Sequence, residues 1–290
     1  MTRYDRYPVK LLASGIIASL IILLMMHTGN GRAGTDGDFR QRTHQKNQQD
    51  FGENDVSVEI RLGKEVAARI LGKYPRLETQ DLTRYVSLVG KSLALHSNRT
   101  EFDYHFAVLD TDHVNAYSTP GGYIFVTRGA LELVKDEAEL AAVLAHEIAH
   151  VTERHIVREL DIRDKDVSAA GSLGQLLGGA GGSANIAFMQ VVDKATEILF
   201  ETGYRQQDEL DADRVGTLLL ATTGYDPTSL QRYLNRVQAH NGESGQSINT
   251  THPPSQERVE ELARLIQGEG LDKGAYIVAQ ARFTGYVTTK

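Results

Sequence analysis

A five-residue segment, His146-Glu147-Ile148-Ala149-His150, constrains the fold of this chain more than any other feature of its sequence. It lies in a stretch rich in alanine, leucine and glutamate, from Asp136 to about Leu160, which predicts an α-helix. Residues four apart lie one above the other on a helix, so His146 and His150 present their imidazoles to one point, and Glu147 reaches its edge. This arrangement predicts a divalent metal site.

Zinc suits such a site, because imidazole is a borderline ligand and the ion accepts tetrahedral geometry. An open fourth position holds a water molecule whose pKa falls to about 7, and Glu147 would pass the proton of this water to a leaving amine. The chain contains no cysteine, so histidine and carboxylate groups must hold any metal. The alternative, two surface histidines on an amphipathic helix, is disfavoured by the apolar run ahead of the motif.

A catalytic zinc needs a third protein ligand, and two schemes compete for this role. A histidine ten residues after the first is one scheme, but Ile156 occupies that position, and the neighbouring His155 is interpreted as a surface or second-layer residue. The other scheme uses a carboxylate from a second helix, backed by an aspartate four residues later. Glu209 and Asp213 have this spacing, and Asp211 is a poorer candidate because it points in another helical direction.

Two acids at this spacing, taken alone, are usually a solvated helix face. Paired with a preceding His-Glu-x-x-His helix, they favour a ligand and its support. The small Ala212 between them would let a partner helix come close.

The N-terminal segment has the pattern of an export signal. Basic residues precede an uncharged run from Leu11 to Met26, which as a helix spans roughly 24 Å, slightly short for a membrane span and slightly long for a signal core. Cleavage after Ala33 is favoured, and an uncleaved membrane anchor is the alternative. In both cases the body of the protein ends outside the cytoplasm, because positive charge stays inside.

The rest of the chain divides into a linker and one domain. Residues 34–54 are polar and nearly free of aliphatic side chains, so they predict a tether. The predicted organisation is a signal peptide or N-terminal anchor at 1–33, a polar linker at 34–54 and a single domain at 55–290. Within it, the glycine-rich stretch 171–183 is equally compatible with a plain linker and with a functional gate.

The hydrophobic patterns of the domain predict an α+β fold that is mainly α, with a small β-sheet beside the metal helix. The predicted elements are helices at 56–71 and 82–93, strands at 103–109 and 122–126 with a turn at Pro120-Gly121-Gly122, a long helix from Ala184 towards Leu220, and helices after Pro227 and Pro253-Pro254.

The charge of the chain disfavours nucleic acid as a partner. Lys and Arg number 31 against 38 Asp and Glu, a net charge of −7, so a grip on phosphates would need a local basic patch.

Several longer motifs accompany the metal segment in a fixed order. They are Asn115-Ala116-Tyr117-Ser118-Thr119-Pro120-Gly121-Gly122, Thr127–Leu131, Glu139–His150, Glu209–Gly216 and Thr251-His252-Pro253-Pro254. In order and spacing they resemble the M48 family of zinc metallopeptidases, in particular its exported bacterial branch, which is similar to the mitochondrial inner-membrane stress protease of that family. The resemblance runs from about Val56 to Val259 and implies a gluzincin-like domain, similar to thermolysin in its ligand plan.

The resemblance implies roles for individual residues. One zinc ion per chain would be held by His146, His150 and Glu209, with Glu147 as the base and Asp213 behind a ligand.

Two further residues acquire roles from the resemblance. His252 corresponds to a histidine that approaches the zinc, either to stabilise the tetrahedral intermediate or to occupy the water site at rest; otherwise it is a turn residue. Arg258 would supply positive charge to the oxyanion, and its alternative is a solvated helix position.

The segment from Gly121 to Val126 would be an edge strand whose free backbone groups pair with an extended substrate. The predicted substrate-binding residues are Gly121, Gly122, Tyr123, Ile124 and Phe125.

These observations predict a zinc metalloendopeptidase that hydrolyses unfolded or misassembled cell-envelope proteins. It would be periplasmic or anchored to the inner membrane facing the periplasm, with membrane contact through its N-terminal segment. The alternative is a latent zinc-fold chaperone or adaptor in envelope quality control, held inactive by His252 or by the glycine-rich stretch. A purely structural zinc site is disfavoured, because such sites usually close the fourth position with a protein ligand.

Overall fold

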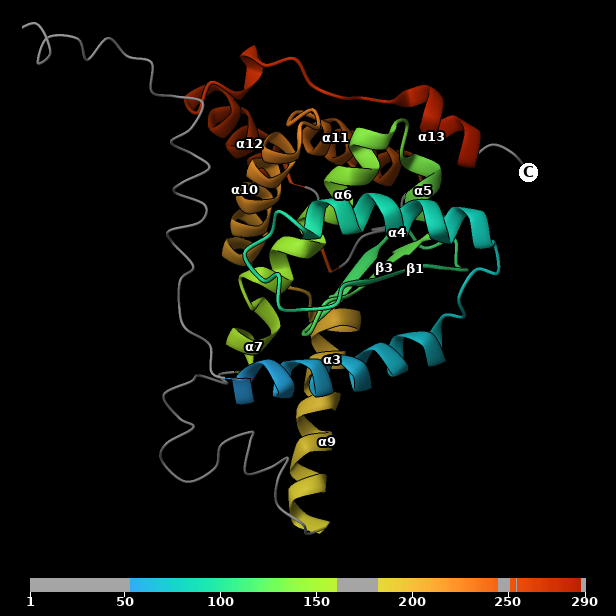
Figure 1. Cartoon of the computed structure of the whole chain (residues 1–290), viewed down its shortest axis with the longest axis vertical. Coiled ribbons are helices and arrows are strands. Elements are labelled where there is room, and N and C mark those ends of the chain that lie inside the picture. Colours follow the sequence, from blue (N-terminus) through green and yellow to red (C-terminus); the bar gives the residue numbers. More distant parts are fainter. Residues whose placement is uncertain (1–52, 161–181, 245–250, 254, 288–290) are drawn as a thin grey trace, which may run out of the picture. The chain divides into compact units, whose positions relative to one another are not determined.

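The computed structural model describes residues 53–160, 182–244, 251–253 and 255–287, which are mainly helical with one small sheet (Figure 1). The helices are α3 (Glu53–Lys73), α4 (Gln80–Ala94), α5 (Arg128–Leu133), α6 (Glu137–Thr152), α7 (His155–Glu159), α9 (Gly182–Glu197), α10 (Gln206–Thr223), α11 (Ser229–Ser244), α12 (Gln256–Gly268) and α13 (Gln280–Val287), with a π-helical segment η2 (Ile198–Thr202) and a 3₁₀ segment η3 (Leu271–Lys273). The strands are β1 (His105–Leu109), β2 (Ala116–Thr119) and β3 (Tyr123–Thr127). The predicted fold class is confirmed.

Some predictions fall outside the described residues. They concern the export segment at 1–33, the linker up to residue 52 and most of the glycine-rich stretch, and they stay predictions. Within the described ranges, no helix combines the length and the apolar character needed to cross a membrane.

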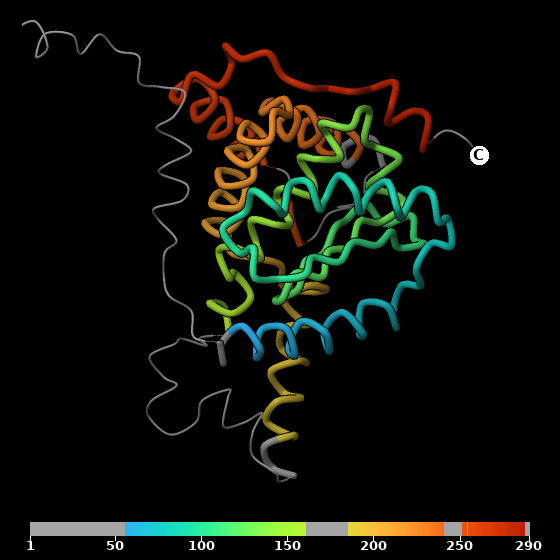
Figure 2. Tube along the Cα trace, in the orientation of Figure 1, coloured from blue at the N-terminus to red at the C-terminus, as the bar shows by residue number. Residues whose placement is uncertain are grey.

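Helix α6 carries the metal segment and is buried along its whole length. The Asp136 carboxylate caps its N-terminus by accepting a hydrogen bond from the Glu139 amide at 2.9 Å. A helix that is buried on all sides needs partners all round, and α6 packs against α4, α10, α11 and β2. The chain trace shows it enclosed between α4 and the orange helices α10 and α11 (Figure 2).

The strand order is β1-β3-β2, with β1 parallel and β2 antiparallel to β3. The prediction that the Gly121–Val126 segment is an edge strand is therefore wrong. Tyr123, Ile124 and Phe125 lie in the central strand, paired with both neighbours, and β2 takes an edge instead. Gly121 and Gly122 form the predicted turn, with φ of 75° and 89°, a conformation that favours glycine.

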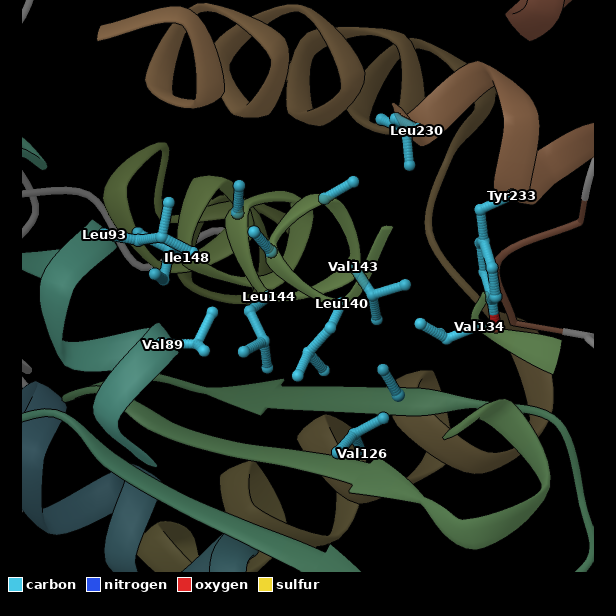
Figure 3. Close-up of a cluster of buried hydrophobic side chains, with 14 of the residues drawn as sticks. Val89, Leu93, Val126, Val134, Leu140, Val143, Leu144, Ile148, Leu230 and Tyr233 are labelled. Carbon is cyan, nitrogen blue, oxygen red and sulfur yellow. The ribbon is translucent and has the colours of Figure 1, made fainter. Parts of the chain in front are cut away.

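Successive residues of the sheet face opposite layers, as strand geometry requires. Phe106, Val108, Ile124 and Val126 join the core formed with α4 and α6. Leu109, Tyr117 and Phe125 join a second core with α3 and α9. Figure 3 shows the first core, in which Val89 and Leu93 of α4, Leu140, Val143, Leu144 and Ile148 of α6, and Val126 of β3 are labelled. The sheet therefore packs against one side of α6, the helix that carries the metal segment.

The predicted single helix from Ala184 to Leu220 is interrupted. Helix α9 ends at Glu197, η2 continues to Thr202, and Gly203 follows with a φ of 70° before α10 begins. A Cβ at Gly203 would lie 2.8 Å from the Thr251 carbonyl oxygen, so the break also permits a close backbone approach. This break lets α10 pack on α6 independently of α9.

Candidate metal centre

Helices α6 and α10 approach closely because small residues lie between them. A Cβ at Gly216 would come within 3.0 Å of the His146 amide nitrogen. Ala212 packs with Ala149 and Val215 in a small apolar cluster, as predicted for a close helix contact. This packing brings Glu209 of α10 to the two histidines of α6.

Four buried side chains form the candidate metal centre. His146, His150, Glu209 and His252 each offer a ligand atom, and these atoms lie within 4.8 Å of one another. The Nε2 atoms of the two α6 histidines are 3.0 Å apart, and the Glu209 oxygens lie 3.5 Å from His146 Nε2 and 3.4 Å from His150 Nε2.

The donor set fits zinc. In a tetrahedral site with zinc–ligand bonds of 2.0–2.1 Å, neighbouring ligand atoms lie roughly 3.3–3.4 Å apart. The three separations above are close to this value. Two imidazoles and one carboxylate are also a donor set that zinc prefers. The predicted ligands are thus brought together, although they come from two helices far apart in sequence.

His146 is held from behind by a carboxylate. Its Nδ1 lies 2.9 Å from Asp213 Oδ1, which leaves Nε2 to face the centre. The Arg258 guanidinium binds both Asp213 oxygens at 2.7 Å. Burial raises the pKa of Asp213, but the Arg258 charge outweighs burial and the pKa lies below its ordinary value. Asp213 therefore stays ionised and fixes the orientation of the His146 ring.

Arg258 has other contacts that bear on its predicted role. It pairs with Glu209 Oε2 at 2.9 Å and donates to the Pro253 carbonyl at 3.1 Å. Because its nitrogens already contact Asp213, Glu209 and this carbonyl, the guanidinium stabilises the two carboxylates. The predicted interaction of Arg258 with an oxyanion stays a prediction.

His150 is held from behind by another histidine. His155 Nδ1 lies 2.7 Å from His150 Nδ1, and His155 is fully buried. The surface interpretation of His155 is therefore wrong, and the second-layer interpretation is right. The surface position would require α6 to continue past Thr152, whereas Arg154, with a φ of 57°, precedes a new helix that returns His155 to the site.

Tyr204 is a further site residue that the sequence argument missed. Its ring stacks on His150, with centroids 4.0 Å apart and planes at 17°. It follows the break at Gly203, so its position depends on an interruption that the helical pattern did not reveal. Burial, together with the charges of Glu147 and Glu209, raises the pKa of its phenol well above the ordinary value.

Glu147 of α6 and His252 of the segment before α12 both lie beside the candidate metal ligands. Glu147 is buried, and its Oε2 has no hydrogen-bond partner among the described residues. His252 Nε2 lies 3.8 Å from Glu147 Oε1, and His252 Nδ1 lies 2.8 Å from Glu209 Oε1. A buried carboxylate with an open acceptor beside the ligand atoms is arranged to take a proton from a molecule held there.

The pKa values of the ligand groups are shifted in different directions. Burial lowers the pKa of His146, but Asp213 and Glu209 outweigh burial and raise it to about 9. Burial also lowers the pKa of His150, here without full compensation. The pKa of Glu209 lies well below its ordinary value, because His252 and Arg258 outweigh its burial. The carboxylate is therefore charged and available as a ligand.

A small adjoining cavity of ≈ 30 Å³ lies beside this centre. Its polar lining includes His146, Glu147, His252 and Arg258. Its apolar lining, called the apolar wall below, includes Val143 of α6 and Leu230, Tyr233 and Leu234 of α11. Figure 3 shows Leu230 and Tyr233 on the α11 side of the core.

Comparison with known proteins identifies the family. The model of peptidase family M48 matches residues 78–266. The chain is 29% identical over 211 residues to the beta-barrel assembly-enhancing protease of Escherichia coli strain K12, covering 70% of this chain and 43% of that protein. It is 27% identical over 220 residues to the mitochondrial metalloendopeptidase OMA1 of Schizosaccharomyces pombe, covering 72% of this chain and 62% of that protein.

The chain thus spans less than half the length of its bacterial relative and about three fifths of the yeast one. The family match covers more than half of the chain and includes the metal segment, Glu209 and Asp213. The predicted relationship, including the likeness to a bacterial and a mitochondrial branch, is confirmed, and the chain belongs to peptidase family M48.

Proposed function

We propose that the chain is a zinc-dependent endopeptidase that hydrolyses peptide bonds in unfolded or misassembled envelope proteins. One observation carries this proposal: two imidazole nitrogens and a carboxylate lie at the spacing of zinc ligands, with the Glu147 carboxylate beside them. Family membership and the metalloendopeptidase names of the relatives support the reaction class.

The proposed roles follow from the contacts. His146, His150 and Glu209 hold the ion, and Asp213 orients His146. A bound zinc ion supplies Lewis acidity toward the scissile carbonyl and toward a water molecule. Glu147 takes the proton of this water and passes it to the nitrogen of the leaving amine. His252, close to both Glu147 and Glu209, is placed to stabilise the tetrahedral intermediate or to fill the water position at rest.

Edge strand β2 replaces the wrongly predicted strand as the element that binds the substrate backbone. Thr127 donates its amide to the Asn115 carbonyl at 3.0 Å, so the alternation of an antiparallel ladder turns the main-chain groups of Ala116 and Ser118 away from β3. The Ala116 amide donates to Asn115 Oδ1 at 3.0 Å, so the Ala116 carbonyl and the Ser118 groups are the ones offered to a peptide. Ala116 also lines the cavity that contains His146 and Glu147. We propose that an extended peptide pairs with this edge, a mode that tolerates many sequences.

The apolar wall of the cavity supports a preference in the substrate. Glu147 must lie beside the leaving nitrogen, so the residue that contributes this nitrogen places its side chain near the same cavity. We propose that an aliphatic side chain packs against this wall, because a charged one would lose hydration against Leu230 and Leu234.

The proposed substrate class and cellular location rest on the relatives and on the N-terminal sequence rather than on the geometry of the site. The bacterial relatives are named for enhancing the assembly of beta-barrels, and we propose that this chain likewise acts in the cell envelope. The basic and apolar N-terminal segment supports export to the periplasm, with cleavage or membrane anchoring as the two outcomes.

The decisive experiment measures casein hydrolysis and zinc content together. We expect the wild-type protein to hydrolyse casein with one zinc per chain, and Glu147→Gln to keep the zinc while kcat falls by about 10²–10⁴-fold. Glu132→Gln, the same substitution at an exposed position, should leave both unchanged.

A wild-type protein that binds one zinc per chain but hydrolyses nothing would overturn the enzyme proposal. The second candidate, a latent zinc-fold chaperone or adaptor, would then apply. The position of His252 within the ligand group is the observation that favours it.

A further inference from the structure

The two predicted histidine ligands are supported in different ways. His146 rests on the Asp213 carboxylate, whereas His150 rests on the imidazole of His155 at 2.7 Å. An imidazole behind a ligand histidine is an unusual support, because carboxylates, backbone carbonyls and water are the common ones. His155 is fully buried, so no bulk solvent can take its place.

The short contact fixes the direction of the hydrogen bond. If His150 binds a metal through Nε2, its remaining proton sits on Nδ1, and this N–H must donate. His155 Nδ1 must then be the acceptor, which leaves the proton of His155 on Nε2. That nitrogen faces Asp211 Oδ2 at 3.7 Å and Asp208 Oδ1 at 3.9 Å, two carboxylates that favour a proton there.

Arginine side chains hold the Asp208 and Asp211 carboxylates that face His155. Arg158 and Arg205 contact Asp208 at 3.0 and 3.1 Å, and Arg214 contacts Asp211 at 3.0 Å. The protons of the two rings therefore have one consistent arrangement, in which His150 Nδ1 donates to His155 Nδ1 and the Nε2–H of His155 faces the carboxylates of α10.

The backbone conformation at the start of α7 brings His155 next to His150. Arg154 adopts the left-handed conformation, which costs free energy for a residue other than glycine. Its Nε pairs with Glu59 Oε1 at 3.0 Å, and Glu59 is buried on α3. This ion pair ties the turn to another helix and fixes the origin of α7, whose first residue is His155.

We propose that His155 is a positioning residue that holds His150 in the tautomer and ring orientation required of a zinc ligand, by accepting the hydrogen bond from its Nδ1. The proposal rests on the ligand role of His150 given above. Tyr204, stacked on the face of the same ring, fixes the remaining rotation.

The test compares two substitutions of nearly equal size at this position. In His155→Asn the amide oxygen can still accept the bond from His150, whereas in His155→Leu no acceptor remains. Zinc affinity, measured by competition with a chromophoric chelator, should fall about 10–100-fold in His155→Leu. In His155→Asn it should stay within about threefold of the wild-type value, since the acceptor that matters is retained.

A control separates this effect from packing. Val157→Ala removes buried volume from the same short helix without touching His150, and zinc affinity should not change. The absorption spectrum of the cobalt-substituted protein should change in His155→Leu alone, because ligand geometry sets that spectrum. Circular dichroism verifies that each variant is folded.

Equal affinities for His155→Leu and His155→Asn, whether both retained or both lost, would overturn the proposal. These readouts do not require peptidase activity. A chain that binds zinc in a His155-dependent way but cleaves no substrate would contradict the proposed function and leave this inference standing.

Discussion

At the scale of single residues, the two predicted histidine ligands differ in the group that contacts the Nδ1 atom of each ring. His146 is backed by the negative charge of Asp213, and His150 by an imidazole that carries no negative charge. The charge difference explains why the pKa of His146 is raised to about 9 while that of His150 is lowered, although both rings are buried on one helix face. Two residues of the same type therefore compete differently with protons for a metal.

The raised pKa of His146 predicts how zinc affinity depends on pH. Below pH 9 the metal-free chain carries a proton on His146, and zinc must displace it. The apparent affinity should therefore rise about tenfold per pH unit between pH 7 and pH 9 and level off above. Chelator competition across this range measures the slope.

The raised pKa of His146 also makes the stability of the metal-free fold depend on pH, in the opposite direction to the zinc affinity: stability falls as the pH rises. A folded pKa of about 9 against an ordinary 6.5 stabilises the fold fully below pH 6.5, and this contribution is lost as the pH rises through 9. Asp213→Asn removes one of the two carboxylates that raise the pKa of His146, so its zinc affinity should level off at a lower pH. An affinity that does not change between pH 7 and pH 9 in the wild-type protein would contradict the assignment.

At the scale of elements, the site is built where α6, α10 and the segment after α11 meet. The motif helix and the Glu209–Asp213 spacing were predictable, because both depend on periodicity within one helix. The position of His155, the stacking of Tyr204 and the strand order were not. Each depends on a chain reversal or on non-local pairing, which a local hydrophobic pattern does not encode.

The cavity-lining residues of helix α11 lead to a prediction of which substrate side chain the proposed peptidase prefers after the scissile bond. Leu234 forms part of the apolar cavity wall, so Leu234→Ala enlarges the cavity that should receive the residue after the scissile bond. The wild-type protein should cleave before leucine, valine or methionine. Leu234→Ala should shift the ratio of kcat/KM for phenylalanine over leucine upward by about 10-fold, since a few methylenes decide such ratios.

The control for this prediction is Val237→Ala, a truncation of another buried residue of α11 that does not line the cavity. Mass spectrometry of cleaved peptide libraries gives the preference at each position. Cleavage that depends on Glu147 but shows no selection after the cut would contradict the cavity assignment and leave the peptidase proposal intact.

At the scale of the whole described domain, the centre joins segments that are far apart in the sequence. The ligand atoms come from α6, α10 and the Thr251–Pro253 segment, and Arg258 of α12 closes the cluster through Asp213 and Glu209. Among the residues that the structure describes, Glu209 pairs with His252, Arg258 and the two histidines of α6, so a cation bound there would add a further link between these segments. Metal binding and folding are therefore coupled.

This coupling predicts that zinc removal destabilises the fold by a measurable amount. At a zinc concentration about 1,000 times the dissociation constant, binding adds about 4 kcal/mol to the free energy of unfolding. For a domain of 150–250 residues this corresponds to roughly 8–16 °C in Tm, so dialysis against a chelator should lower Tm by that amount and added zinc should restore it. Glu209→Gln weakens the third ligand, so its Tm should respond far less to the chelator. If the Tm of the wild-type protein were insensitive to the chelator although zinc was released, the centre would not link these helices energetically, because a ligand that binds only the folded state must stabilise it.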